Sequence, residues 1–271
     1  MRNDRNDRNE RPMRNDRKQK RENPTREFPE ELIEGRNAVT EALRSGRTMD
    51  HVFIAEGETD KGLSRIAGMA REAGAVVKTA DRRKLDMMSP TGAHQGVIAF
   101  AAAHDYATVE EILKTAEERG EAPLIIICDE LNDPHNLGAI LRSAECAGAH
   151  GVIIPKRRSV GLTAVVGKTS AGAIEYMKVA RVSNLASTIE SLKKRGIWVF
   201  GTAADGDRLL YDADLKGPAA LVIGSEGFGM SRIVEEACDF KVRIPMKGSI
   251  NSLNASAAAS IMLYEAVRQR Q

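Results

Sequence analysis

Aromatic residues are scarce in this sequence, at 4% of its 271 residues, which disfavours a protein built mainly on base-stacking platforms. Its three cysteines are odd in number and share no C-x-x-C spacing, which argues against a disulfide framework. The five histidines show no metal-ligand spacing with one another or with the cysteines, so no metal site is predicted. No apolar run approaches the ~18 residues needed to cross a bilayer, so no membrane association is predicted.

The net charge of +2 conceals an uneven distribution of charge along the chain. Residues 1–26 carry ten Lys or Arg against five acidic residues, within repeats of Arg-Asn-Asp or Arg-Asn-Glu. Because this segment has almost no apolar residues to offset the entropy of ordering, residues 1–28 are predicted to form a disordered basic tail. The tail either adds salt-sensitive contacts to RNA phosphates or only keeps the protein soluble. With no apolar segment after the tail, we expect a cytoplasmic protein.

The rest of the chain divides into three parts by the rhythm of its apolar residues. Residues 29–104 are predicted to form a small α/β unit, and residues 105–122 a linker with one helix. In residues 123–271, short apolar strands alternate with helices, which predicts an α/β domain with a mostly parallel sheet covered by helices on both faces. The strands are expected at 124–128, 151–154, 197–202, 219–224 and 241–244, and the helices at 137–147, 185–195, 231–236 and 253–268.

Polar residues gather where these strands end, which is the edge at which parallel sheets bind ligands. In the helix that follows the first strand, Arg142 lies off the apolar stripe and is free to face a substrate. Asn136, at or near the start of that helix, either caps it or binds RNA. The same two interpretations apply to Ser252 and Asn254 at the start of the last helix.

The stretch Gly224–Gly229 follows another strand, and its glycines allow backbone amides to approach a ligand closely. Its order is G-x-x-G-x-G, whereas a dinucleotide-binding loop has G-x-G-x-x-G. No GxxxxGK[ST] phosphate loop occurs anywhere in the sequence. An oxidoreductase that uses nicotinamide or flavin is therefore disfavoured.

Taken together, the stretches 133–144, 221–230 and 241–265 resemble, in order and spacing, the three motifs of the TrmH/SpoU-type branch of the SPOUT RNA methyltransferases. The resemblance covers roughly residues 30–268. It implies a catalytic domain whose sheet end is tied in a deep trefoil knot, S-adenosylmethionine as the cofactor, and a homodimer. Residues 29–104 resemble the L30e-like RNA substrate-binding domain of this branch, which points to the RlmB-like 23S rRNA guanosine 2′-O-methyltransferases.

The resemblance also implies roles for individual residues. Arg142 would clamp the phosphate beside the target ribose, and either Arg142 or Glu226 would accept the proton of the 2′-hydroxyl; the sequence leaves this choice open. The expected catalytic residues are Asn136, Arg142, Glu226, Ser252 and Asn254, and the expected cofactor-binding residues are Thr202, Ala203, Gly224, Ile244 and Leu253. Surface arginines of the substrate domain are expected to meet RNA phosphates, namely Arg36, Arg44 and Arg47.

Two other functions stay open at this point. A tRNA guanosine 2′-O-methyltransferase of the same branch is the nearest alternative, although such enzymes usually lack the N-terminal domain. A non-catalytic RNA-binding factor in ribosome assembly is the other, and the intact set of expected catalytic residues argues against it.

Overall fold

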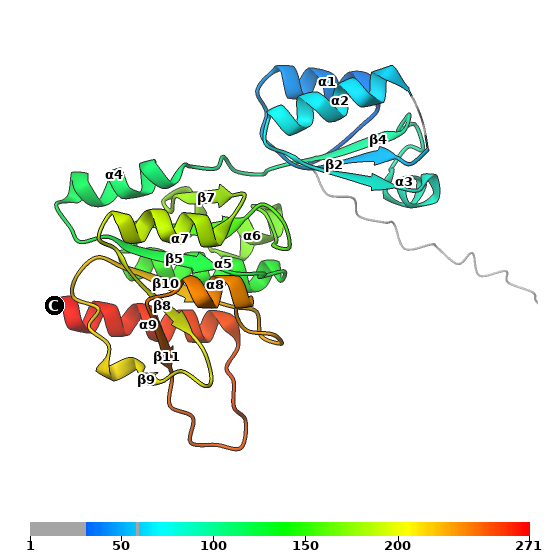
Figure 1. Cartoon of the computed structure of the whole chain (residues 1–271). Helices are drawn as coiled ribbons and strands as arrows, with labels where there is room; N and C mark the ends of the chain where they lie inside the picture. The colour runs from blue at the N-terminus through cyan, green and yellow to red at the C-terminus, as the bar shows by residue number, and fades with distance from the viewer. Residues whose placement is uncertain (1–30, 58–59) are drawn as a thin grey trace, which may run out of the picture.

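The structure is a computed structural model that describes residues 31–57 and 60–271, so the tail predicted at 1–28 lies outside the described residues. The chain forms two sheets, which stand side by side in Figure 1. The N-terminal sheet has four strands in the order β1-β4-β2-β3. Its elements are β1 (Leu32–Glu34), α1 (Arg36–Arg44), β2 (Met49–Ala55), α2 (Lys61–Glu72), β3 (Val76–Ala80), α3 (Arg82–Met88) and β4 (Val97–Ala101).

The C-terminal sheet has seven strands in the order β7-β6-β5-β10-β8-β11-β9, and every neighbouring pair is parallel. The prediction of a mostly parallel sheet is confirmed. After α4 (Val109–Arg119), its elements are β5 (Leu124–Cys128), α5 (Pro134–Cys146), β6 (Gly151–Pro155), α6 (Ala164–Thr169), β7 (Val179–Val182), α7 (Leu185–Lys194), β8 (Trp198–Thr202), β9 (Arg208–Leu209), β10 (Ala219–Ile223), α8 (Arg232–Ala237), β11 (Phe240–Arg243) and α9 (Ala255–Arg270), with short 3-10 helices at Ala173–Glu175 and Leu210–Asp212.

The central strands β5 and β10 are buried along their whole length, as continuous apolar runs in a parallel sheet should be. Helices α5 and α9 pack on one face of the sheet, and α4, α7 and α8 pack on the other. The prediction of helices on both faces is therefore confirmed. The strands β7 and β9 and the helix α6 were not predicted, because their runs of two to six residues are too short to show a period.

The capping residues of two helices next to the expected site show which polar side chains serve as caps. Helix α5 begins one turn earlier than predicted, with Pro134 in its first turn and the Asp133 carboxylate accepting the backbone N–H of His135 at 2.9 Å. Asn136 is therefore not the cap, and the capping interpretation of this residue is wrong. Asn254 is the cap of α9, and its Oδ1 accepts the backbone N–H of Ser256 at 2.9 Å.

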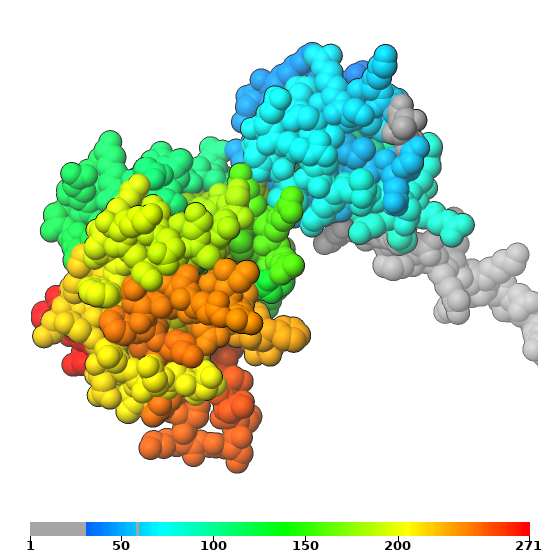
Figure 2. All heavy atoms as spheres, in the orientation of Figure 1, coloured from blue at the N-terminus to red at the C-terminus, as the bar shows by residue number. Residues whose placement is uncertain are grey.

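A buried polar cluster joins the two sheets, which belong to separate lobes in the space-filling view of Figure 2. Asp50 of β2 forms an ion pair with Arg181 of β7, and both side chains are nearly inaccessible to solvent. The hydroxyl of Tyr106 donates to Asp50 Oδ1 at 2.6 Å, and the Arg181 Cζ lies 4.3 Å from the Tyr106 ring centroid. Burial raises the pKa of Asp50, and the Tyr106 hydrogen bond and the Arg181 charge oppose that rise. We call Asp50, Tyr106 and Arg181 the junction cluster.

Candidate functional site

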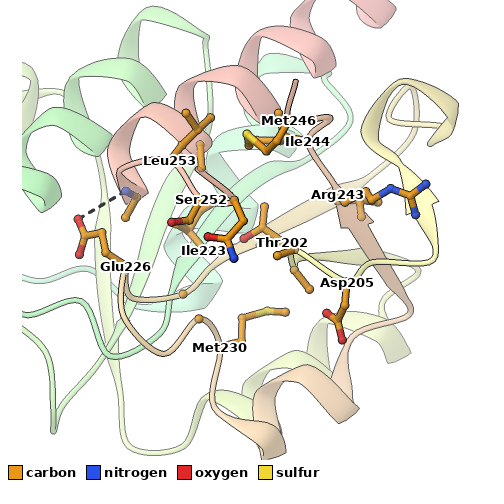
Figure 3. Close-up of a pocket in the computed structure, with 18 of the residues that line it drawn as sticks. Thr202, Asp205, Ile223, Glu226, Met230, Arg243, Ile244, Met246, Ser252 and Leu253 are labelled. Atoms are coloured by element: carbon orange, nitrogen blue, oxygen red, sulfur yellow. Dashed lines mark hydrogen bonds between the residues drawn. The ribbon is translucent and has the colours of Figure 1, made fainter. Parts of the chain in front are cut away.

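A cavity of about 930 Å³ opens at the carboxyl ends of β8, β10 and β11, the edge at which parallel sheets bind ligands. Three loops from distant parts of the sequence surround it (Figure 3). This volume falls within the range of roughly 300–1,000 Å³ that is usual for small-molecule sites. The residues that line it come from the segments 202–205, 223–230, 242–247 and 251–253, together with Leu209, Glu235, Ala255 and Ala258.

Two backbone hydrogen bonds close the loop 224–230 on itself, and we call it the closed loop. Ser225 N–H donates to the Gly229 carbonyl at 3.0 Å, and Gly229 N–H donates back to the Ser225 carbonyl at 2.8 Å. A Cβ at position 224 would lie 2.1 Å from the Gly229 carbonyl carbon, so only glycine fits there. The turn directs Phe228 into solvent, where its side chain is 94% exposed.

A hydrogen-bonded cluster at the edge of this cavity unites residues from all three motifs. The Asn136 amide donates to Glu226 Oε1. Asn254 Nδ2 donates to Asn136 Oδ1 at 2.8 Å and to Glu226 Oε1 at 3.1 Å, while its Oδ1 remains engaged as the α9 cap. The backbone N–H of Ala255 is directed at the same carboxylate oxygen, at 3.5 Å (Figure 3). The sequence separates these three side chains by up to 118 residues, and the fold brings them into contact.

The residues expected to bind the cofactor all line the cavity. Thr202 and Ala203 lie at the end of β8, Gly224 begins the closed loop, and Ile244 and Leu253 lie on opposite ends of the loop between β11 and α9. The Thr202 hydroxyl donates to the Val222 carbonyl at 3.0 Å, so this side chain joins β8 to β10. Ser252, expected to be catalytic, also lines the cavity (Figure 3).

Arg142 is placed differently from the other expected catalytic residues. Leu137, Ile140 and Leu141 of α5 are fully buried, and Arg142 lies off this stripe and is exposed, as the pattern predicted. Like Asn136 and Asn254, it is not among the residues that line the cavity, but unlike them it has no hydrogen bond or ion pair with residues 31–57 or 60–271. Within one chain, its guanidinium is left available to an anion.

The expected RNA-binding arginines differ in their surroundings. Arg36 forms an ion pair with Asp60 at 2.5 Å, and its Nε donates to the Gln95 carbonyl at 2.9 Å. Arg44 pairs with Glu41 at 2.6 Å. Arg47 is exposed. Arg36 and Arg44 therefore have acidic partners that partly neutralise them.

Several residues of the site were missed by reasoning from the sequence. The Asp129 carboxylate is buried at the end of β5 and accepts the backbone N–H of Ser231 at 2.6 Å, which connects the end of the closed loop to the neighbouring strand. Asp205 and Arg243 line the cavity, and the Arg243 guanidinium donates to the Gly206 carbonyl at 2.6 Å. Their position directly after or at the end of a strand was the available signal.

Cys128 is buried at the end of β5 and Cys238 is half-buried just before β11, and neither suits nucleophilic chemistry. Burial raises the pKa of Cys128 and of Cys238 to about 12, and the neighbouring carboxylates Asp129 and Asp239 add to the rise. Both thiols are therefore protonated at neutral pH, and a thiol is a poor nucleophile. Among residues 31–57 and 60–271, no group of three or more His, Cys, Asp or Glu is placed to hold a metal ion. Over the same ranges, no helix is long and apolar enough to cross a membrane.

Comparisons with known proteins agree with this geometry. Residues 123–264 match the SpoU rRNA Methylase family, and residues 32–107 match the RNA 2′-O ribose methyltransferase substrate binding family. YacO of Bacillus subtilis, named as a putative TrmH family tRNA/rRNA methyltransferase, is 49% identical over 89% of this chain and 96% of its own length.

Two solved structures are informative. The SpoU methyltransferase AviRb from Streptomyces viridochromogenes, crystallised in complex with the cofactor AdoMet, is 28% identical over 88% of this chain and 90% of its own, with a TM-score of 0.57. The TrmH/SpoU tRNA modifying enzyme of A. aeolicus is 29% identical with a TM-score of 0.50, but it covers only 55% of this chain and 76% of its own.

Proposed function

Because this chain belongs to the SpoU family of RNA 2′-O-ribose methyltransferases, we propose that it transfers a methyl group from S-adenosylmethionine to the 2′-hydroxyl of a guanosine in 23S rRNA. One observation carries this proposal. Asn136, Glu226 and Asn254, one from each motif, meet at the rim of a cavity large enough for the cofactor. The reaction then requires only that two bound molecules be held in line, and holding them so supplies much of the acceleration.

The cavity suits the cofactor by the chemistry of its walls. Backbone groups at Gly224, Ile244 and Leu253 are available to hold the adenine and methionine parts, and the apolar side chains of Ile223 and Met246 flank them (Figure 3). S-adenosylmethionine, when bound, supplies an electrophilic methyl group on a sulfonium. Its holders would be Thr202, Ala203, Gly224, Ile244 and Leu253.

We assign the proton-accepting role to Glu226. Its carboxylate is aligned by amide donors from Asn136 and Asn254, so its remaining oxygen lone pairs can take the ribose hydroxyl proton. Arg142 carries a guanidinium, which is a cation and a poor base, so it is better suited to hold the phosphate beside that ribose and to stabilise charge. Ser252, on the cavity wall, would position the ribose or the methionine end of the cofactor.

We further propose that the active form is a homodimer. Arg142 is exposed and has no hydrogen bond to the cluster of Asn136, Glu226 and Asn254, so in the proposed dimer a guanidinium reaches the transferred methyl from the partner subunit. Exposed apolar side chains close to the motifs, at Ile250 and Tyr264, support burial of this region.

Mixing two inactive variants tests whether the site is shared. Arg142→Ala and Asn254→Ala proteins are each expected to be inactive, and co-refolded mixtures should recover up to about a quarter of wild-type activity if each site takes residues from both chains. Light scattering gives the oligomeric state. No recovery from a mixture that scattering shows to contain dimers would mean that each subunit completes its own site.

The presence of an N-terminal substrate-binding region favours ribosomal RNA over tRNA as the substrate. The N-terminal residues 32–107 match a substrate-binding family, and the tRNA modifying enzyme of A. aeolicus covers 55% of this chain. The assignment is tested by mapping 2′-O-methyl groups in rRNA and tRNA from cells with and without this protein. Loss of one 23S rRNA guanosine methylation is expected. Loss of a tRNA methylation instead would establish the alternative substrate, and cofactor binding without any loss would point to a non-catalytic assembly factor.

The remaining parts of the proposal follow from the family. We take residues 29–104 as the substrate domain, 105–122 as the linker and 123–271 as the catalytic domain, with the cytoplasm as the compartment of its RNA. The trefoil knot is part of the proposal, and the small residues Ala255 and Ala259, where α9 packs closely on the sheet, suit a threaded helix. Deletion of residues 1–28 is expected to weaken RNA binding mainly at low salt.

A further inference from the structure

The two faces of the N-terminal sheet are covered unequally. Helices α1 and α2 bury one face against residues such as Val52 and Ala99 (Figure 1). Among residues 31–57 and 60–271, the other face is covered by α3 alone, around Leu85 and Ile98. The part of this second face that α3 leaves uncovered carries a group of aromatic and basic side chains. We call it the open sheet face and define it by His51, Phe53, Phe100, Lys78 and Lys84.

Three rings of the open sheet face lie against one another. The centroids of His51 and Phe53 are 6.3 Å apart with an interplanar angle of 26°, and Phe53 meets Phe100 edge to face at 6.0 Å. All three are only half-buried, although the whole chain has just six phenylalanines. Burial lowers the pKa of His51 to about 4, with help from the charges of Lys78 and Arg181, so this ring is neutral at physiological pH.

Two lysines converge on the central ring. The Nζ atoms of Lys78 and Lys84 each lie 5.7 Å from the Phe53 centroid. Both side chains are exposed, and neither has an ion pair within the described ranges 31–57 and 60–271. Burial lowers the pKa of Lys78, and the nearby charge of Lys84 lowers it further. Like charges held together without a carboxylate form a site that gains from an anion.

The open sheet face combines aromatic rings with lysines, whereas α1, where the RNA contacts were expected, does not. Arg36 and Arg44 have acidic partners at 2.5 and 2.6 Å and stand on a helix without exposed rings. On the open sheet face, cations without acidic partners among the described residues lie next to half-exposed aromatic rings. Single-stranded nucleic acid binds such surfaces, because bases stack on rings while phosphates meet the lysines.

We propose that the open sheet face binds a single-stranded segment of the RNA substrate, with a base stacked at Phe53 and adjoining phosphates held by Lys78 and Lys84. This inference rests on the proposed function, since it concerns the same RNA. The face begins at the junction cluster, because His51 follows Asp50 directly on β2. The His51 end of the face is therefore the end nearest the C-terminal sheet.

Binding to a fluorescent single-stranded oligonucleotide and to the full RNA substrate tests this inference, with full-length proteins and a series of salt concentrations. Lys78→Gln with Lys84→Gln should reduce the slope of log Kd against log salt by about 1.4, because each lysine that neutralises a phosphate contributes ~0.7 to that slope. Phe53→Leu keeps an apolar side chain but removes the stacking ring. It should weaken binding on the order of tenfold without changing the salt slope.

Two further double variants complete the experiment. Lys61→Gln with Arg71→Gln removes equal charge from α2, on the covered side of the same domain, and should leave the salt slope nearly unchanged. Arg44→Gln with Arg47→Gln tests the contacts expected on α1. Each variant is first checked for wild-type melting temperature and for unchanged affinity for S-adenosylmethionine.

The outcomes separate this inference from the proposed function. If the wild-type protein neither binds nor methylates RNA, the proposed function fails. If it does both, and the Lys78/Lys84 and Phe53 variants bind as the wild type does, the inference is overturned, because the face is then unused or is covered by another segment of this chain or a second copy. If the Arg44/Arg47 variant loses more affinity than the Lys78/Lys84 variant, the inference is also overturned, because the RNA then binds mainly at α1.

Discussion

Asp50→Ala is expected to loosen the connection between the two sheets. The Asp50 and Arg181 side chains are only 5% and 6% exposed, so removal of the carboxylate leaves a guanidinium buried without a counter-charge. Its remaining partners are the carbonyls of Met49 at 3.0 Å and Gly74 at 3.5 Å. Breaking a buried ion pair in this way costs about 3–5 kcal/mol. The cost is smaller if the two domains separate and water reaches Arg181, so this range is an upper bound.

Hydrogen exchange measures this destabilisation where it occurs. The amides of Ala103 and Ala107 donate to carbonyls of the catalytic domain, at Leu162 and Val179, and both bonds must open when the junction opens. Their exchange should accelerate by about 10²- to 10³-fold, since each 1.4 kcal/mol is a factor of ten. If RNA contacts both domains as we propose, the KM for RNA should rise, while the affinity for S-adenosylmethionine stays unchanged.

A surface ion pair supplies the matched control. Glu110 and Arg195 lie 3.0 Å apart on exposed side chains, so Glu110→Ala should have little effect on exchange or activity. Asp50→Asn keeps the shape of the side chain and removes only its charge, and an intermediate acceleration is expected. Equal exchange at Ala103 in Asp50→Ala and Glu110→Ala proteins would refute the role assigned to the junction cluster.

Three other predictions concern the site and its surroundings. Gly224→Ala should abolish measurable S-adenosylmethionine binding in calorimetry, because its Cβ would meet backbone atoms at 2.1–2.4 Å, while Gly227→Ala, with nothing within 4 Å, should bind normally. Glu226→Gln should lower kcat by about 10²-fold or more with little change in cofactor affinity, and an unchanged kcat would exclude it as the proton acceptor. Because burial lowers the pKa of His51 to about 4, the folded protein binds fewer protons there than the unfolded chain, so this residue's contribution to stability falls as pH drops from 6.5 to 4. In urea titrations at a series of pH values, His51→Asn should reduce this fall in the free energy of unfolding, and His135→Asn, at an exposed position, should not. If both variants lose stability with pH as steeply as the wild type, His51 is not held neutral in the folded protein.

The sequence alone determined the class of architecture and many of the residues that meet at the site. Continuous apolar runs such as Leu124–Cys128 have to be buried on both faces, which requires a parallel sheet covered by helices. The polar residues at strand ends then fall at one edge, and the motif resemblance identified Glu226 and Asn254 among them. Apolar runs and short motifs can be recognised in the sequence because each depends only on residues that are close together in the chain.

Only the tertiary structure decided how those residues are used. The contact of Asn136 with Glu226 spans 90 residues, and no local pattern reports which side chains meet across such a distance. The same holds for the pairing of Asp50 with Arg181, across 131 residues, and for the sheet face that α3 leaves open around Phe53. Whether a polar or aromatic side chain is buried, paired or free depends on what packs against it, and packing is a property of the whole fold.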